Sequence, residues 1–174
     1  RRLADRRCVT CGHRLMLSER FTQRVLRDEL KIEDWTLRQW LSELRRGSID
    51  RVTPLLRVPG SAWRRHSIRH NRRKVRGCNM AVWRSDFFEV DGFDATFVGW
   101  GHEDQDLVTR MGMLGVTLKD GRWATGVLHL WHPPADKANE TSHYEWIAAS
   151  LTENRVRAVR GVSALNSATE DSPD

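Results

Sequence analysis

The sequence predicts one α/β domain, because strand-like and helix-like segments alternate along a chain long enough to bury a core. The chain has 174 residues, of which 39% are apolar and 30% charged, as is ordinary for a soluble globular protein. No stretch approaches the roughly 18 consecutive apolar residues of a membrane span. Three cysteines, an odd number, argue against a disulfide framework and favour a reducing compartment. We therefore expect a cytoplasmic protein with one domain over residues 1–162 and a disordered polar tail over 163–174.

The N-terminal part is predicted to hold a strand followed by two helices. Residues 8–17 have the pattern of a short strand and turn, and Ser18 is placed to cap a helix that runs to about Leu30. A second helix is expected over 33–46, with Gly47 at its end. Its i, i+3, i+4, i+7 apolar stripe consists of Leu37, Trp40, Leu41 and Leu44.

The C-terminal part is predicted to alternate strands and helices. Asp91-Gly92 closes a short helix, Gly115 ends a longer one, and Asp120-Gly121 is a favoured hairpin turn between two strands. The predicted elements are a buried strand over 79–83, a one-turn helix over 86–90, a helix over 103–114, strands over 116–119 and 122–130, and a helix over 143–151.

The net charge of +6 is concentrated in one segment. Residues 63–76 carry seven Lys or Arg residues and no acid. Such a segment suits nucleic acid, anionic lipid headgroups or a phosphorylated substrate. A solvated arginine-rich connector explains the same composition. Eight tryptophans are the second unusual count; an indole ring at a polar cleft can bind a sugar, but we expect most of these rings in the core.

The most distinctive segment runs from Gly99 to Asp106 and spells Gly-Trp-Gly-His-Glu-Asp-Gln-Asp. Two glycines around Trp100 predict a tight turn that brings the backbone and one large ring close to a ligand. The acids that follow lie at a predicted helix start, where acids favour the helix dipole. That structural explanation accounts for one or two acids but not for the Gly-Trp-Gly before them. Adjacent carboxylates such as Glu103 and Asp104, held at a helix terminus, suit general-base catalysis.

Two histidines, His129 and His132, lie near the end of a predicted strand and are followed by Pro133-Pro134. Histidine pairs can hold a divalent metal. Residues three apart on a straight strand face opposite sides, so both can bind one ion only if the backbone turns, which the prolines permit. For either histidine alone, a core or surface position is the simpler interpretation.

Cys8 and Cys11, with His66 and His70, offer a different interpretation. They suggest a zinc module with a basic arm on nucleic acid, but zinc-finger ligand pairs lie about a dozen residues apart, and here more than fifty intervene. Small residues in a buried strand explain the cysteines better. The alternative function is therefore a non-catalytic basic module that binds nucleic acid or anionic lipid, with zinc as an optional ligand.

Four blocks, in their order and spacing, resemble one family: 77–84, 90–94, 99–107 and 129–133. The family is that of bacterial family-2 glycosyltransferases of the GT-A fold, whose C-terminal part is similar to that of β-1,4-galactosyltransferases. The resemblance spans residues 9–133 and implies the C-terminal, acceptor- and metal-side portion of a GT-A fold. Asp91 stands where the family usually has Asn, and His102 stands where Gly is common.

The resemblance implies roles for the matched residues. Asp104 matches the general base of the inverting members, and Glu103 matches a neighbour that hydrogen-bonds a sugar. Trp100 and Gly101 match the mobile loop whose ring packs on the sugars. Further substrate-binding candidates are Asn79 and Asp106. His129 and His132 fall in the segment that supplies a histidine ligand to Mn²⁺ (or Mg²⁺) on the donor's diphosphate.

The implied function is transfer of a hexose from a nucleotide sugar, UDP-linked, to a hydroxyl of a surface-glycan or lipid-linked acceptor. Retaining relatives share much of the segment around Trp100, so inversion is the expectation rather than a consequence of the motif. The expected partners are the nucleotide-sugar donor, a glycan or glycolipid acceptor and the inner membrane surface, contacted peripherally through residues 63–76; no nucleic acid is expected.

Members of this family open with a nucleotide-binding half that ends in an Asp-x-Asp metal motif. The resemblance begins after that half, and residues 104–106 spell the motif only within the acceptor-side block. We therefore expect a separate N-terminal half as a partner, and little or no transferase activity from this chain alone.

Overall fold

The computed structural model describes residues 5–27, 29–58 and 75–164. Most of the basic segment, the histidines at 66 and 70, and the predicted tail from residue 165 onward lie outside the described residues. The described elements are β1 (Cys8–Cys11), β2 (His13–Met16), α1 (Glu19–Leu26), η1 (Ile32–Asp34), α2 (Leu37–Arg45), η2 (Thr53–Leu55), η5 (Gly77–Asn79), β3 (Met80–Ala81), α3 (Arg84–Glu89), α4 (Glu103–Met113), β4 (Thr117–Asp120), β5 (Gly126–His129) and α5 (Glu140–Thr152). The predicted α/β class is confirmed.

Two small sheets organise the chain. The first has the order β3-β1-β4, in which β1 is antiparallel to β3 and parallel to β4. The second pairs β2 with β5 in parallel. Gly12 lies where the chain passes from one sheet to the other, and a Cβ there would lie 2.2 Å from both Asn79 Nδ2 and Thr125 Oγ1. Only glycine allows this close approach.

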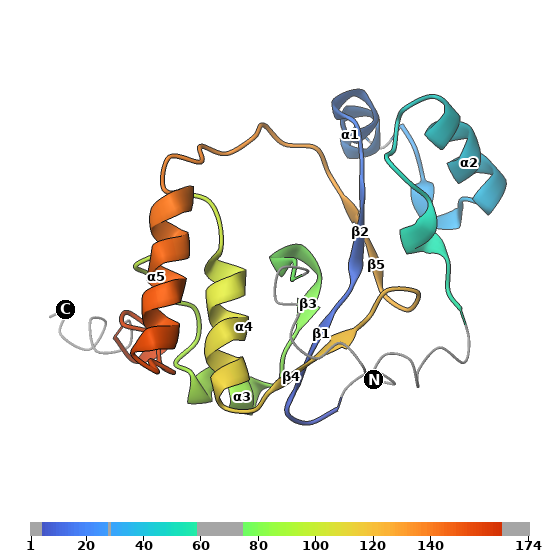
Figure 1. Cartoon of the computed structure of the whole chain (residues 1–174). Coiled ribbons are helices and arrows are strands. Elements are labelled where there is room, and N and C mark those ends of the chain that lie inside the picture. Colours follow the sequence, from blue (N-terminus) through green and yellow to red (C-terminus); the bar gives the residue numbers. More distant parts are fainter. Residues whose placement is uncertain (1–4, 28, 59–74, 165–174) are drawn as a thin grey trace, which may run out of the picture.

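A separate core supports each sheet. α4 packs on the three-stranded sheet through a cluster that includes Val9, Leu107 and Met111. α1 and α2 pack on β2 through a second cluster that includes Leu15 and Phe21. Figure 1 shows the consequence: α4 and α5 stand together on one side of the molecule, and α1 and α2 stand beyond β2 on the other.

Most described tryptophans are not in these cores, contrary to the sequence-based expectation. Only Trp40 is buried, and it packs edge-on to Trp35 with ring centroids 5.1 Å apart. Four rings are at least one-third exposed: Trp83, Trp100, Trp123 and Trp146. Small cores between short sheets have little room for further indole rings, so these rings cover the surface between elements.

The helices begin where their capping residues predict. Ser18 caps α1, its Oγ accepting from the backbone N–H of Phe21 at 3.3 Å. α2 begins at Leu37 rather than at residue 33, because Thr36 and Gln39 form a capping box in which the Thr36 N–H donates to Gln39 Oε1 at 2.8 Å. The expected helix over 103–114 is confirmed as α4.

Two expectations about strands are wrong. The segments around Asp120-Gly121 form β4 and β5, but these strands do not pair with each other as a hairpin. Instead, β4 pairs with β1 and β5 pairs with β2, both in parallel. The Gly121 N–H donates to Cys11 O at 2.7 Å, which ties the turn to β1 and carries the chain on to the second sheet. The expected buried strand over 79–83 is the two-residue edge strand β3, in which Ala81 is exposed.

The segment after α5 is fastened to the Asp91–Asp94 turn. Asp94 accepts from the backbone N–H groups of Val159 at 2.8 Å and Arg160 at 3.2 Å. Asp91 accepts from the N–H of Ser163 at 2.9 Å. Burial alone would raise the pKa of both carboxyls, but these hydrogen bonds hold each pKa below its ordinary value.

Acid is therefore expected to release this segment. A carboxyl with a depressed folded-state pKa stabilises the fold fully above its unfolded pKa, and this contribution is lost as pH falls through the folded pKa. We expect amide-exchange protection of Val159, Arg160 and Ser163 to fall between about pH 4 and pH 2. In Asp94→Asn, protection at Val159 and Arg160 should lose this pH dependence. Equal protection in the wild type at about pH 6 and pH 2 contradicts the expectation.

Candidate active site

Asp104 lies in the first turn of α4 and is half-buried. Its Oδ2 accepts a hydrogen bond from the backbone N–H of Gly77 at 2.7 Å. A Cβ on Gly77 would contact Asp104 Cβ at 3.4 Å, so the η5 turn packs closely on the carboxylate. The helix terminus and the η5 N–H together fix the position of the predicted base. Glu103, its neighbour, is exposed.

Asp106 does not face a substrate surface. Its side chain is 0% exposed and is paired with Arg110, which is also 0% exposed, at 2.7 Å. Arg110 donates further to Val90 O at 2.7 Å and to Gly92 O at 2.9 Å. Burial raises the pKa of the Asp106 carboxyl, and Arg110 opposes the rise. This burial corrects the substrate-binding role expected for Asp106: its carboxyl positions Arg110, and Arg110 joins α4 to the turn at residues 90–92.

Asn79 also uses its side chain within the fold. Its Nδ2 donates to His13 O at 2.7 Å and to Thr125 O at 3.4 Å. These bonds join η5 to the start of β2 and to the turn before β5. Through its amide nitrogen, Asn79 therefore fixes the position of η5, the turn that contacts Asp104.

Residues 98–102 form the segment that we call the Trp100 loop. Gly99 and Gly101 have φ values of +89° and +108°, which confirms the tight turn expected from the sequence. The Trp100 ring is 40% exposed, and Lys137 Nζ lies 4.6 Å from its centroid. The ring thus stands at the surface, with a cation on one face.

His129 and His132 point at each other. Their Nε2 atoms are 3.3 Å apart, so the backbone turn after β5 brings together two side chains that a straight strand would separate. His132 Nδ1 lies 3.0 Å from Pro133 O, and a carbonyl only accepts, so Nδ1 carries the proton and Nε2 offers a lone pair. Burial lowers the pKa of His129, with Arg14 and His132 adding to the effect, and favours the neutral form that binds metal.

This pair fits two positions of a metal site. Ligands about 2.1 Å from one ion lie roughly 3 Å apart, close to the Nε2–Nε2 distance. Within the described residues, no cluster of three or more His, Cys, Asp or Glu side chains could hold an ion. Any further ligands would come from a bound substrate or from chain outside these residues.

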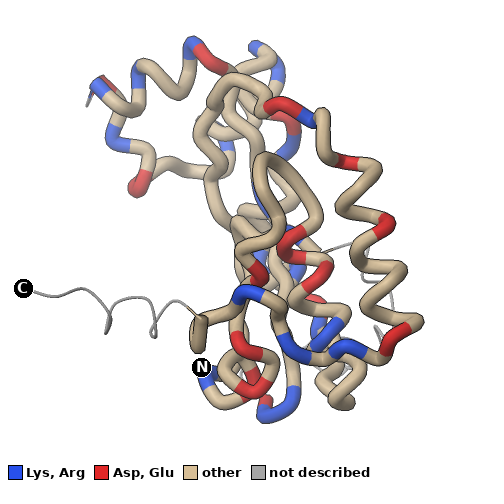
Figure 2. Tube along the Cα trace, turned by 90° about the vertical axis from the view of Figure 1, so that its left-hand side faces the viewer, with Lys and Arg blue, Asp and Glu red and all other residues tan. Residues whose placement is uncertain are grey.

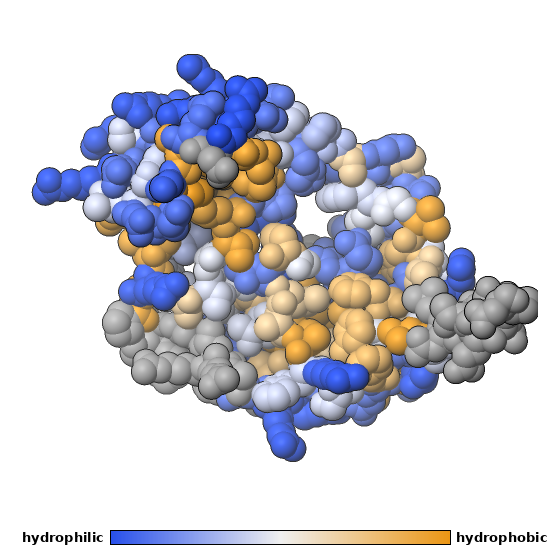
Figure 3. Space-filling view, turned by 180° about the vertical axis from the view of Figure 1, so that it is seen from behind, coloured by the Kyte–Doolittle hydropathy of each residue, from blue (hydrophilic) through white to orange (hydrophobic). Residues whose placement is uncertain are grey.

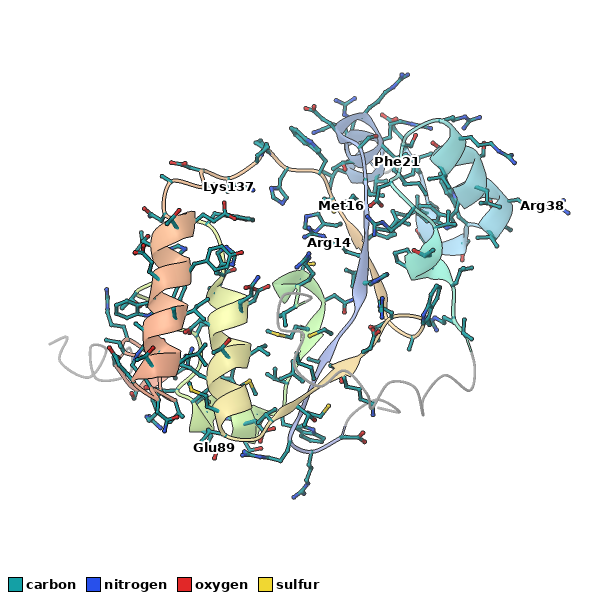
Figure 4. All side chains as sticks on the ribbon, viewed as in Figure 1. Arg14, Met16, Phe21, Arg38, Glu89 and Lys137 are labelled. Carbon is teal, nitrogen blue, oxygen red and sulfur yellow. The ribbon has the colours of Figure 1, made fainter. Side chains whose placement is uncertain are left out.

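Arg14 is a site residue that the sequence analysis missed. Arg14 and Met16 share one face of β2, and Met16 is the register partner of His129. Arg14 Nη1 reaches Cys78 Sγ at 3.9 Å, one residue from the amide that binds Asp104. Figure 4 shows Arg14 pointing from β2 into the space beside β3. A charged residue beside buried Leu15 was the available signal.

The space around Arg14 is open. The chain leaves β5, crosses as an extended exposed segment over residues 132–139 and enters α5 (Figure 1). Figure 3 shows an opening through the molecule beneath this crossing.

A pocket of about 370 Å³ adjoins this face. Burial lowers the pKa of His13 in its lining, and Arg122 lowers it further. Cationic side chains outnumber acids here, but Arg51, Lys119 and Arg122 are each paired with a carboxylate, so the pocket favours an anionic group only weakly. The charged lining residues are Arg14, Arg51, Arg76, Lys119 and Arg122 with Asp50 and Asp120.

Residues 59–132 match a family model described as the N-terminal domain of galactosyltransferase. The chain contains a galactosyltransferase-like region. That region includes Asp104, the Trp100 loop and both histidines. It accounts for fewer than half of the 174 residues. Searches of curated proteins and of solved structures gave no match.

The described residues hold only part of the alternative module: the two cysteines lie within them, but most of the basic segment and the histidines at 66 and 70 do not. Burial raises the pKa of Cys8, and it raises the pKa of Cys11 to about 12, with Asp104 adding to the effect. As free thiols, both cysteines are therefore protonated near neutral pH. Figure 2 shows basic and acidic positions interspersed along the described chain. In the same residues, no helix is long and apolar enough to cross a membrane.

Proposed function

We propose that the galactosyltransferase-like region transfers a hexose from a UDP-linked donor to an acceptor hydroxyl with inversion, as in bacterial family-2 enzymes of the GT-A fold. One observation carries this proposal: two side chains contact η5. Its Gly77 N–H donates to the Asp104 carboxylate, and Arg14 Nη1 reaches Cys78 Sγ. A base and a cation thus meet at one turn, on the face that also holds His129. The match to the galactosyltransferase family supports the reaction class.

Asp104 is the proposed general base. Its Oδ2 is held by the Gly77 N–H, and its half-buried position leaves it open to an acceptor hydroxyl. The carboxylate takes the hydroxyl proton as the oxygen attacks the anomeric carbon from the face opposite the diphosphate. Glu103, exposed on the same turn, hydrogen-bonds a sugar hydroxyl.

Arg14 and the histidine pair are the proposed groups that stabilise the leaving diphosphate. Arg14 offsets the negative charge that develops on the departing diphosphate. His129 and His132 would hold Mn²⁺ or Mg²⁺ through their Nε2 atoms. When bound there, the ion supplies Lewis-acid stabilisation of the same charge.

Trp100 and Gly101 complete the proposed acceptor side, where the ring packs on a sugar. The proposed acceptor is a surface glycan or a lipid-linked glycan. The enzyme would act in the cytoplasm, peripherally at the inner membrane.

The proposed function is tested by hexose transfer. The chain is incubated with UDP-galactose, Mn²⁺ and a panel of glycan acceptors, alone and with a nucleotide-binding half. We expect Mn²⁺-dependent release of UDP coupled to product formation when both halves are present. Release that is independent of acceptor and metal in every combination contradicts the proposal.

Metal binding gives a second test. His129→Ala and His132→Ala are each expected to weaken Mn²⁺ binding by roughly tenfold or more, because each removes one of two protein ligands. The affinity is measured by titration with Mn²⁺ followed by electron paramagnetic resonance. His13→Ala is the matched control, since its ring lies in the anionic-ligand pocket rather than at the pair. Equal Mn²⁺ affinity in all four proteins removes the pair from the site.

A further inference from the structure

The Trp100 loop is held from outside by the start of α5. His143 Nδ1 lies 2.7 Å from the carbonyl oxygen of Gly101. Asn139 Nδ2 donates to the carbonyl of Val98 at 2.9 Å. The two ends of the loop are therefore bound by side chains four residues apart at the start of α5, with Trp100 between them.

Gly101 is buried, with a φ of +108° that glycine adopts readily. A Cβ built there would meet nothing within 4 Å. The hydrogen-bond partner of its carbonyl therefore adds to burial in fixing its conformation. Because a carbonyl only accepts, His143 must carry its proton on Nδ1. The imidazole is itself 7% exposed and packs on Phe97 with ring centroids 4.9 Å apart, so its position is fixed.

His102 supplies a second set of contacts between the Trp100 loop and α5. It adopts the left-handed conformation, with φ of +72°, at a position where the resembled family commonly has glycine. Its ring is buried, lies 3.9 Å from the Tyr144 ring and places Nε2 3.5 Å from Glu140 Oε1. The His102 ring therefore packs against α5, although neither of its ring nitrogens has a hydrogen-bond partner among the described residues.

We infer that the first turn of α5 positions Trp100 for the sugar, with His143 as the central positioning residue and Asn139 and Tyr144 as its supports. This inference rests on the proposed function for the role of Trp100, but the hold itself is independent of catalysis. α5 also follows directly on the segment that leaves His132. The same short stretch of chain therefore joins the histidine pair to the Trp100 loop (Figure 1).

The test compares His143→Leu with His143→Asn. Asparagine can place an N–H donor where Nδ1 lies, whereas leucine cannot donate. Amide hydrogen exchange of residues 98–102 is expected to rise roughly fivefold in His143→Leu, the size expected for one net hydrogen bond. It should return close to the wild-type rate in His143→Asn. Exchange in β1 and β4 should not change.

Asn139→Ala supplies a milder variant, because Asn139 is exposed. It is expected to raise exchange at the Val98 end of the loop. With UDP-galactose and an accepted glycan, His143→Leu should raise the acceptor KM more than it lowers kcat, and His143→Asn should restore KM. Unchanged loop exchange in both His143→Leu and Asn139→Ala overturns the inference, as does an equal rise throughout the fold. If amide exchange of the Trp100 loop changes as expected but no hexose transfer is detected under any condition, the positioning of the loop by α5 is supported and the proposed function is refuted.

Discussion

Replacing Arg110 by methionine is expected to destabilise the fold by about 3–5 kcal/mol, the cost of leaving a buried carboxylate without its partner. Among the described residues, Arg110 is the largest fully buried side chain, and its guanidinium binds Asp106 and two backbone carbonyls. Methionine fills similar space but returns none of these donors. The loss is measured as the shift of the urea unfolding midpoint at neutral pH.

Arg157→Met is the matched control. Arg157 also contacts a carboxylate, that of Asp91 at 3.4 Å in the turn whose carbonyls Arg110 binds, but its side chain is 56% exposed. An exposed pair of this kind contributes about 0–1 kcal/mol. Combining Arg110→Met with Asp106→Asn should cost less than the sum of the two single changes, because the second removes the orphaned charge. Similar losses for Arg110→Met and Arg157→Met contradict this account of the buried pair.

Asp104→Asn is expected to lower hexose transfer by about 10²–10⁴-fold, the usual contribution of a general base. The asparagine carbonyl can still accept from the Gly77 N–H, so the contact with η5 is kept while the basicity is lost. The effect should fall on kcat, measured as UDP release coupled to product in the transfer assay.

Glu103→Gln is the control for charge at this helix terminus, since Glu103 is exposed on the same turn. It removes an acid without removing the proposed base, and its effect on kcat should be much smaller. Equal losses for both variants would assign the effect to the helix dipole. A fully active Asp104→Asn enzyme would dismiss Asp104 as the base.

Local chemistry made much of the fold predictable. Ser18 and the Gly115 stop gave one boundary each of α1 and α4, because a cap or a glycine acts within one turn. Pairing was not predictable in this way. Asp120-Gly121 suits a hairpin locally, yet the Gly121 amide binds Cys11 and sends the next strand to another sheet.

In the candidate site, too, features set by neighbouring residues were predictable and features set by distant residues were not. The position of Asp104 at a helix start followed from its neighbours, and the glycines around Trp100 have the backbone expected of them. The burial of Asp106 could not be predicted, because nothing in the sequence indicated that its partner Arg110 is buried. Arg14 was missed because its place beside η5 depends on contacts between distant segments.

The most direct test of a site shared by Asp104 and the histidine pair uses the paramagnetism of Mn²⁺. Nuclear magnetic resonance spectra of the 20.2 kDa chain are recorded with substoichiometric Mn²⁺ and with Mg²⁺ as the diamagnetic control. If the account is right, the amide signals of Arg14, Gly77 and Asp104 broaden together with those of His129 and His132, while signals from α3, at the opposite end of α4, stay sharp (Figure 1). Broadening at the histidines that leaves Gly77 and Asp104 untouched would contradict it.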